Sequence, residues 1–224
     1  MKNYVNETEK VFVQVDNDDC AESPREWDNL WTILTWTSDY NSIDSNPYAD
    51  LDTFLADYLT EKQIENLYKS NSEKEFFERI EKRFYELGYL IKPISKYEHG
   101  QVSYYAEILR GWDSGVVGLA MVNIEDIKKE YGASVLSKAL KEKIHAILDS
   151  ELDTYNSWAN GYVYTVALID FDGDIVDSLG GMIGYDTEKD MIQEYIDNYT
   201  EYNFEDFELK ELDSSTVTRY FVED

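Results

Sequence analysis

The chain has 224 residues, of which 43% are apolar and 15% aromatic, so it can build a packed core and is not an intrinsically disordered acidic chain. Its 47 acidic and 20 basic residues give a net charge of −27, which argues against direct binding to a nucleic-acid backbone because phosphates require Lys and Arg. A single cysteine, Cys20, excludes an internal disulfide, and the sequence has no Cys/His cluster for zinc.

The acidic charge is concentrated at the two ends of the sequence. Residues 1–60 and 186–224 each carry −10, whereas residues 61–185 carry −7. Halophilic adaptation spreads acidic residues evenly, so this distribution favours dedicated acidic regions. No run of about 18 apolar residues is present, and the first ten residues lack the apolar core of a signal peptide. We therefore expect an intracellular protein that does not bind membranes.

In chain order, apolar alternation predicts strands over residues 10–15 and 30–37, joined through an ordered loop, PREWDN, that is pinned by Trp27. Helical spacing then predicts three helices, over residues 50–59, 61–68 and 73–87. The third begins with a capping box at Ser72 and Glu75 and stops at Gly88.

The second half of the sequence predicts further hairpins and helices. We expect strands over residues 89–94, 102–106, 116–122, 162–169 and 175–179, and helices over 124–131, 134–158 and 186–199, with two strands in the tail. This order of elements predicts a single α+β domain over residues 1–224, with a largely antiparallel β-sheet packed against three or four helices. The acidic C-terminal helix and tail begin at about residue 186.

One stretch, GWDSGVVGLAMV, joins a glycine-hinged polar segment to an apolar strand. We expect Trp112 to be a core anchor, and the side chains of Asp113 and Ser114 to bond backbone in the turn. Gly115 and Gly118 would permit tight backbone geometry before and within the strand. The stretch is therefore expected to organise the fold.

Three aspartates, Asp170, Asp172 and Asp174, resemble the start of a calcium-binding loop. An EF-hand loop needs an acidic residue at its twelfth position, where this chain has Gly181. Asp-Gly between two apolar runs is instead a strong hairpin signal, so we predict a hairpin turn here.

Ser114, His99 and either Asp28 or Asp113 provide the residue types of a hydrolase triad. Ser114 does not lie in a Gly-x-Ser-x-Gly elbow, and no phosphate loop, dinucleotide fingerprint or metal-binding His pair is present. We assign no catalytic residue, no metal and no cofactor. The other histidine, His145, is expected at the surface or half-buried on its helix.

The last helix carries acidic residues at intervals of four, four, three and four, which places them on one side of a helix, about 6 Å apart for each four-residue interval. Its apolar residues fall on another side: Met191, Ile192, Tyr195, Ile196 and Tyr199. A solvated helix surface and a dedicated anionic surface both explain this pattern. The acidic face, as it is called below, comprises Asp186, Asp190, Glu194, Asp197, Glu201, Glu205, Asp206 and Glu208, with Glu211 beyond it.

Five phrases in the same order carry a resemblance. They are residues 24–30 (PREWDNL), 97–99 (YEH), 112–118 (WDSGVVG), 151–155 (ELDTY) with 161–164 (GYVY), and 176–178 (VDS) with 184–185 (GY). Together they resemble a family of uncharacterised proteins carried by bacterial and archaeal phages and mobile elements, over roughly residues 24–185. The resemblance implies a small accessory protein in the host cytoplasm, of the kind that opposes host defences.

The resemblance carries over no functional residue. Members of that family often have Cys and His after the Trp-Asp-Asn phrase, where this chain has residues 35–38 (TWTS). This departure argues against a catalytic nucleophile or a metal site at that position.

The net charge and the resemblance to mobile-element proteins together predict a non-enzymatic inhibitor of a host defence protein, such as a restriction or CRISPR nuclease. It would mimic DNA and place the acidic face in a basic DNA-binding groove. We expect no nucleic acid and no membrane as a partner, and a homo-oligomer stays open. One alternative is an anti-defence enzyme or sponge that acts on a nucleotide signal through a pocket near His99, Trp112, Asp113 and Ser114. Another is a structural or regulatory phage protein whose acidity serves solubility.

Overall fold

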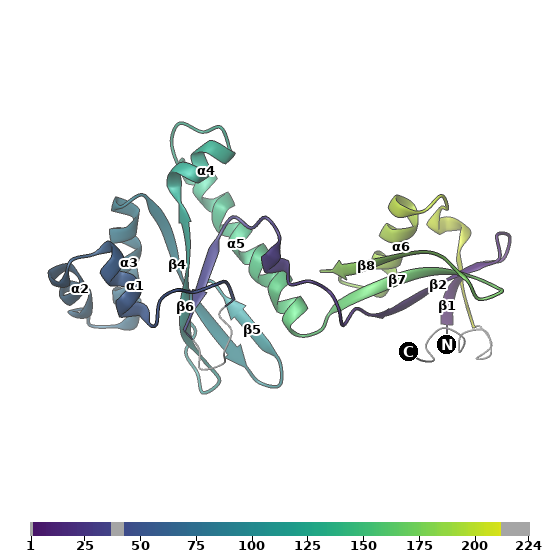
Figure 1. The fold of residues 1–224 in the computed structure, drawn as a ribbon, viewed down its shortest axis with the longest axis horizontal. Helices are drawn as coiled ribbons and strands as arrows, with labels where there is room; N and C mark the ends of the chain where they lie inside the picture. Colours follow the sequence, from purple (N-terminus) through teal and green to yellow (C-terminus); the bar gives the residue numbers. More distant parts are fainter. Residues whose placement is uncertain (1, 37–42, 212–224) are drawn as a thin grey trace. The chain divides into compact units, whose positions relative to one another are not determined.

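The computed structural model describes residues 2–36 and 43–211 (Figure 1). The chain divides into two compact units, which we call the terminal unit (Met1–Glu22 with Ser157–Asp224) and the central unit (Ser23–Asn156). Both combine helices with an antiparallel sheet, which confirms the predicted α+β class. The single-domain organisation stays a prediction, and each unit is described by itself.

The terminal unit is a five-stranded sheet with a helix packed on one face (Figure 1). The strand order is β8-β7-β2-β1-β9, and every neighbouring pair is antiparallel. Its elements are β1 (Lys2–Asn6), β2 (Val11–Asn17), β7 (Val163–Asp170), β8 (Ile175–Ile183), α6 (Glu188–Tyr199), a 3-10 turn η2 (Phe204–Asp206) and β9 (Glu208–Glu211). Strand β9 is one of the two strands predicted for the tail, and the tail from residue 212 lies outside the described residues.

The core of the terminal unit follows from the alternation of strand β2 and the periodicity of helix α6. Val11 and Val13 project from one face of β2 and pack with Ile192 and Ile196 of α6, together with Tyr195. The apolar side that the spacing of the last helix indicates is therefore its buried side at these residues. Tyr199, which falls on the same side by spacing, is the last residue of the helix and is 54% exposed.

The turn between β7 and β8 is a hairpin, as predicted. The Asp170 carboxylate Oδ1 accepts the backbone N–H groups of Gly173 at 2.7 Å and Asp174 at 2.8 Å. Gly173 has φ of 94°, a conformation that glycine adopts without strain. Asp170 is thus used to close the turn.

The central unit is a four-stranded antiparallel sheet with helices on both faces (Figure 1). The strand order is β3-β6-β4-β5, from β3 (Thr32–Thr35), β4 (Tyr89–Glu98), β5 (Val102–Tyr105) and β6 (Ser114–Asn123). One face packs against α1 (Leu51–Tyr58), α2 (Glu61–Tyr68) and α3 (Glu73–Glu86), and the other against α4 (Ile124–Glu130) and α5 (Lys138–Ala159). A 3-10 turn, η1 (Pro24–Glu26), precedes β3, and Thr37 at the end of that predicted strand lies outside the described residues.

Helix α3 forms where its capping box and periodicity predict it. Ser72 Oγ accepts the backbone N–H of Glu75 at 3.1 Å, and Phe77, Ile80 and Phe84 are buried against the sheet. Gly88 follows with φ of 91°. Among the described residues, no helix has the length and apolar composition needed to cross a membrane.

Strand β6, formed by the stretch GWDSGVVGLAMV, lies inside the sheet between β3 and β4. A Cβ atom on Gly118 would lie 2.2 Å from the Leu34 carbonyl oxygen, so this position requires glycine, as predicted. A Cβ on Gly115 would meet no atom within 4 Å, so tight packing does not require glycine there. The prediction that Trp112 is a core anchor is wrong. Trp112 is fully exposed because it lies in the turn that the Gly111–Ser114 bridge closes, before the strand begins.

Candidate functional site

Negative charge is concentrated in the terminal unit. Its residues include 23 acidic and 5 basic side chains, a net charge of −18, whereas the larger central unit has 24 acidic and 15 basic side chains, a net charge of −9. Residues 1–22, with a net charge of −4, join the acidic C-terminal region in this unit through the pairing of β1 with β9, whereas residues 23–60, with −6, belong to the central unit. Folding therefore joins charge that is far apart along the chain.

All eight residues of the acidic face are exposed. Only three of them lie on the helix itself, because α6 spans Glu188–Tyr199. These three are Asp190, Glu194 and Asp197, whereas Asp186 precedes the helix and Glu201 follows it. Of the others, Glu205 and Asp206 belong to η2, and Glu208 begins β9. The predicted helical stripe is thus shorter than the sequence spacing indicates, and turn residues extend it.

Hydrogen bonds within the unit orient part of the acidic face. Thr187, the N-cap of α6, accepts the backbone N–H of Asp190 at 3.1 Å and donates its hydroxyl to Asp190 Oδ2 at 2.6 Å. Asp197 Oδ1 accepts the backbone N–H of Phe204 at 2.9 Å, which fixes η2 against the end of the helix. Burial and then the charge of Glu194 raise the pKa of Tyr185, whose hydroxyl hydrogen-bonds to that carboxylate.

Few cations compensate this surface. Lys210 Nζ pairs with Glu7 at 2.9 Å and Glu208 at 3.0 Å, and these hydrogen bonds raise the pKa of Lys210. Lys189 Nζ lies 5.8 Å from the centre of the Phe204 ring. Among the described residues, the other seven carboxylates of the acidic face form no ion pair with Lys or Arg. The face is anionic and largely uncompensated.

The acidic face continues into a hollow of about 520 Å³ that a sequence pattern does not reveal. Glu201 and Asp206 line it together with Glu9, which lies in the turn between β1 and β2. Burial, followed by the charges of Glu201 and Glu9, raises the pKa of Tyr202 at the same place. Its remaining lining residues are polar: Asn6, Thr8 and Asn203. Glu9 is therefore an addition to the acidic face that only the strand pairing shows.

In the central unit, the structure brings together two of the residues that resembled a triad. His99 Nδ1 lies 3.3 Å from Asp113 Oδ2 on exposed turns, and Asp113 also accepts the Glu98 backbone N–H at 2.9 Å through its carbonyl oxygen. Ser114 begins β6, and Asp28 lies in the exposed loop after η1. Three cavities of this unit, of about 530, 650 and 430 Å³, are lined by other residues. The pair is an exposed surface contact.

Comparisons with protein-family models, with curated proteins and with solved structures found no match for this chain. The resemblance to phage and mobile-element proteins stays a prediction. Among the described residues, no group of three His, Cys, Asp or Glu side chains has an arrangement suited to a metal ion. Function is therefore inferred from charge and geometry.

Two of the phrases that carry the resemblance meet in a buried ionic network. The Arg25 side chain is 5% exposed and binds Asp44 through Nε at 2.7 Å and Nη2 at 2.8 Å, and Glu151 through Nη1 at 2.9 Å. Asn29 Oδ1 and the Trp31 carbonyl accept its remaining donors at 3.0 and 2.6 Å. Burial alone would lower the pKa of Arg25, but Asp44 and Glu151 outweigh it and raise that pKa.

This network corrects the predicted role of Trp27. Trp27 is 52% exposed, so the PREWDN loop is pinned by the charge of Arg25 and not by the indole ring. Glu151 also accepts the backbone N–H groups of Leu30 at 2.8 Å and Trp31 at 3.3 Å, which ties the loop to helix α5. The phrases therefore have a structural role in the central unit.

Proposed function

We propose that the terminal unit is a binding module that inhibits a host defence protein, such as a restriction or CRISPR nuclease, without catalysis. Its acidic face occupies the basic groove in which the target binds DNA. One observation carries this proposal: seven exposed carboxylates, on and next to a helix that the core holds rigid, have no ion-pair partner among the described residues.

Uncompensated carboxylates on a rigid support resemble a phosphate backbone in their charge. Residues four apart on α6, such as Asp190 and Glu194, are separated by about 6 Å along the axis. Their mutual repulsion disfavours the free protein, and a partner rich in Lys and Arg relieves it. The hydrogen bonds of Asp190 and Asp197 hold these charges in place before binding, which lowers the entropic cost of association.

The proposal is tested by charge reversal at positions that do not hold the fold. Glu201 and Glu205 make no side-chain hydrogen bond to a described residue, and Glu194 bonds only Tyr185. The variant E194K/E201K/E205K should therefore fold and lose inhibition. The matched control makes the same change of charge on exposed residues of the central unit: E65K/E130K/E142K.

Inhibition is measured as DNA binding and cleavage by purified restriction and CRISPR nucleases, which are first selected by pull-down from host lysate at low salt. The native protein should compete with DNA for the nuclease. Its binding to the nuclease should weaken steeply as the salt concentration rises from about 0.05 to 0.3 M, as expected for interactions of many charges. The control variant should behave as the native protein. DNA mimicry is contradicted if binding to the nuclease changes neither with salt nor with added DNA. It is also contradicted if the E194K/E201K/E205K variant and the E65K/E130K/E142K control lose binding equally.

A further inference from the structure

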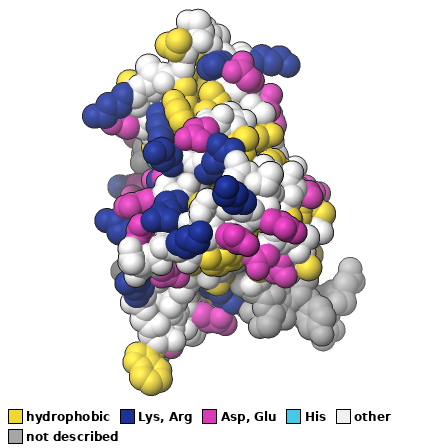
Figure 2. Space-filling view, turned by 90° about the vertical axis from the view of Figure 1, so that its left-hand side faces the viewer, with side chains coloured by type: hydrophobic (Ala, Val, Ile, Leu, Met, Phe, Trp, Pro, Cys, Tyr) yellow, Lys and Arg dark blue, Asp and Glu magenta, His cyan; other side chains and the backbone are white. Residues whose placement is uncertain are grey.

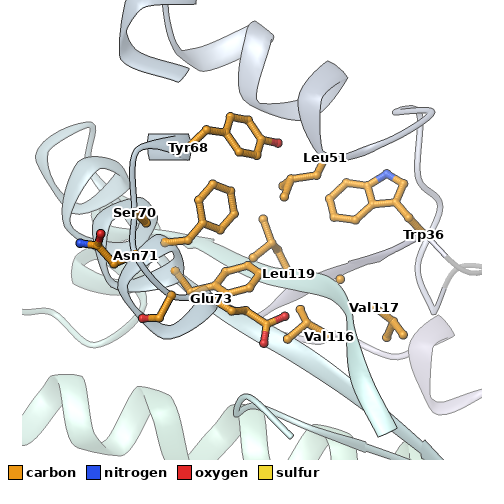
Figure 3. Close-up of a pocket in the computed structure, with 13 residues that line it drawn as sticks. Trp36, Leu51, Tyr68, Ser70, Asn71, Glu73, Val116, Val117 and Leu119 are labelled. Atoms are coloured by element: carbon orange, nitrogen blue, oxygen red, sulfur yellow. The ribbon is translucent and has the colours of Figure 1, made fainter. Parts of the chain in front are cut away.

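A cavity of about 530 Å³ opens in the central unit between helices α1 to α3 and strand β6 (Figure 3). Aromatic side chains form much of its wall: Trp36, Tyr68, Phe76 and Phe77. Leu51 and residues 116–119 of β6 complete the apolar part. This size lies within the range of small-molecule sites, about 300–1,000 Å³, and apolar walls with a few polar groups are typical of them.

Two of the rings are held from outside the cavity. Trp36 Nε1 donates to the Tyr48 carbonyl at 3.0 Å, and the Tyr68 hydroxyl donates to Asp52 Oδ1 on helix α1. Burial and then Asp52 raise the pKa of Tyr68 to about 12, so the hydroxyl keeps the proton that makes this bond. The polar edges of both rings are thus bound elsewhere, and the rings are fixed before a ligand arrives.

The remaining rings pack on this framework. The centres of the Tyr68 and Phe76 rings lie 5.0 Å apart, and those of Phe76 and Phe77 lie 5.3 Å apart at 78°. Phe77 is buried in the core, so the wall is anchored to the sheet. Flat ligands can stack on such a wall.

One charged side chain, Glu73, lines the cavity among the described residues. Figure 3 shows it on the side opposite Tyr68, close to Val116. Its partner Arg110 lies outside this lining, with Nε 3.3 Å from Glu73 Oε2, and both side chains are exposed, so their attraction is weak. The polar residues beside Glu73 are neutral, namely Ser70, Asn71 and Ser72.

We propose that this cavity binds a small planar molecule that carries one positive charge, such as an aromatic amine. The faces of Trp36 and Tyr68 attract a cation through their π systems, and the Glu73 carboxylate supplies the opposite charge. An anionic ligand is disfavoured by Glu73 and by the net charge of −27. The site lies within the central unit and is independent of the acidic face of the terminal unit.

The test uses proflavine, a planar tricyclic cation whose fluorescence anisotropy reports binding, and acridone, a neutral tricycle of similar shape. The full chain should bind proflavine and prefer it to acridone by about tenfold, the contribution of a cation over aromatic faces beside a carboxylate. Glu73→Gln should remove that preference. The matched control Glu65→Gln makes the same change of charge on exposed α2, outside the cavity, and should leave binding unchanged.

Two further variants separate the cavity from unspecific attraction to an acidic protein. Val116→Phe places a ring in the cavity and should abolish binding, while thermal unfolding shows that it is folded. Arg110→Gln frees the Glu73 carboxylate and should tighten proflavine binding. The proposal is overturned if proflavine does not bind, if Glu73→Gln and Glu65→Gln weaken it equally, or if folded Val116→Phe binds as well as the native chain.

Discussion

Arg25 Nη1 and Glu151 Oε2 lie 2.9 Å apart in the central unit, although 126 positions separate the two residues in the sequence. Asp44 binds the other edge of the same guanidinium, so one cation joins η1, helix α5 and the segment after β3. Such a network is fully satisfied only when all its members are present. On the face of the molecule drawn in Figure 2, Lys and Arg side chains lie among Asp and Glu. The Arg25 network differs from exposed ion pairs such as that of Arg110 with Glu73, because its side chains are largely buried.

We predict that Arg25→Met destabilises the protein by about 3–5 kcal/mol, because it leaves Asp44 and Glu151 without their cation in a buried site. Arg25→Lys should also destabilise it, since an ammonium group cannot reproduce the bidentate contact with Asp44. Urea unfolding followed by tryptophan fluorescence measures both. Arg110→Ala removes an exposed pair and serves as the control, with a change below about 0.5 kcal/mol. Equal effects of Arg25→Met and Arg110→Ala would show that the network is dispensable.

Gly118→Ala should destabilise the central sheet by about 3 kcal/mol, at the upper end for an overpacked core. The added Cβ would lie 2.2 Å from the Leu34 carbonyl oxygen, and β3 would have to move away from β6. Gly115→Ala adds the same methyl group on the same strand where no atom lies within 4 Å. Hydrogen exchange of the β3 and β6 amides, compared between the two variants, detects the difference. An unchanged β3–β6 pairing in Gly118→Ala contradicts this account.

Trp112→Ser should change the free energy of unfolding by less than about 0.5 kcal/mol, as for other exposed positions. Trp31→Ala should cost about 3–5 kcal/mol, because Trp31 is buried and its Nε1 donates to the Ile144 carbonyl. The comparison uses the same residue type at an exposed and a buried position. A large loss in Trp112→Ser would restore the core role that the sequence predicted for that residue.

These residues show which features the sequence could predict. The N-cap of Ser72 and the Asp-Gly hairpin are local, since each depends on neighbours within four residues, and both were predicted correctly. The other half of the predicted capping box does not form, because the Glu75 side chain accepts the backbone N–H of Asn71 and not that of Ser72. The burial of Trp112 depends on where the strand begins relative to the turn, and an apolar residue type alone does not determine that. The residue type of Trp112 alone therefore led to a wrong prediction of its burial.

The acidic face was only partly predictable for the same reason. Periodicity indicated the apolar side of α6 and its end at Tyr199, but it did not show that the helix begins only at Glu188, after Asp186. Glu9 joins Glu201 and Asp206 only through the folding of the β1–β2 turn and the segment after α6, which no local pattern records. The partners of Arg25 are likewise set by contacts over long sequence separations.

The last prediction concerns His145 on helix α5, half-buried with its ring centre 6.1 Å from that of Trp31. Burial, followed by the charges of Lys92 and Lys141, lowers the pKa of His145 from 6.5 to about 4. The unfolded chain therefore takes up a proton near pH 6.5, whereas the folded chain stays neutral until about pH 4. Stability is consequently lost as the pH falls through this window.

His145→Gln removes this proton uptake, so the variant should lose less stability than the native protein between pH 7 and pH 5. At pH 5 the difference should be about 1 kcal/mol, below the value that the shift alone gives, because solvent screens the half-buried ring. Urea unfolding at both pH values measures it, and NMR titration of the ring protons should place the midpoint near pH 4. If the variant loses as much stability as the native chain, then other groups, carboxylates above all, account for the pH dependence.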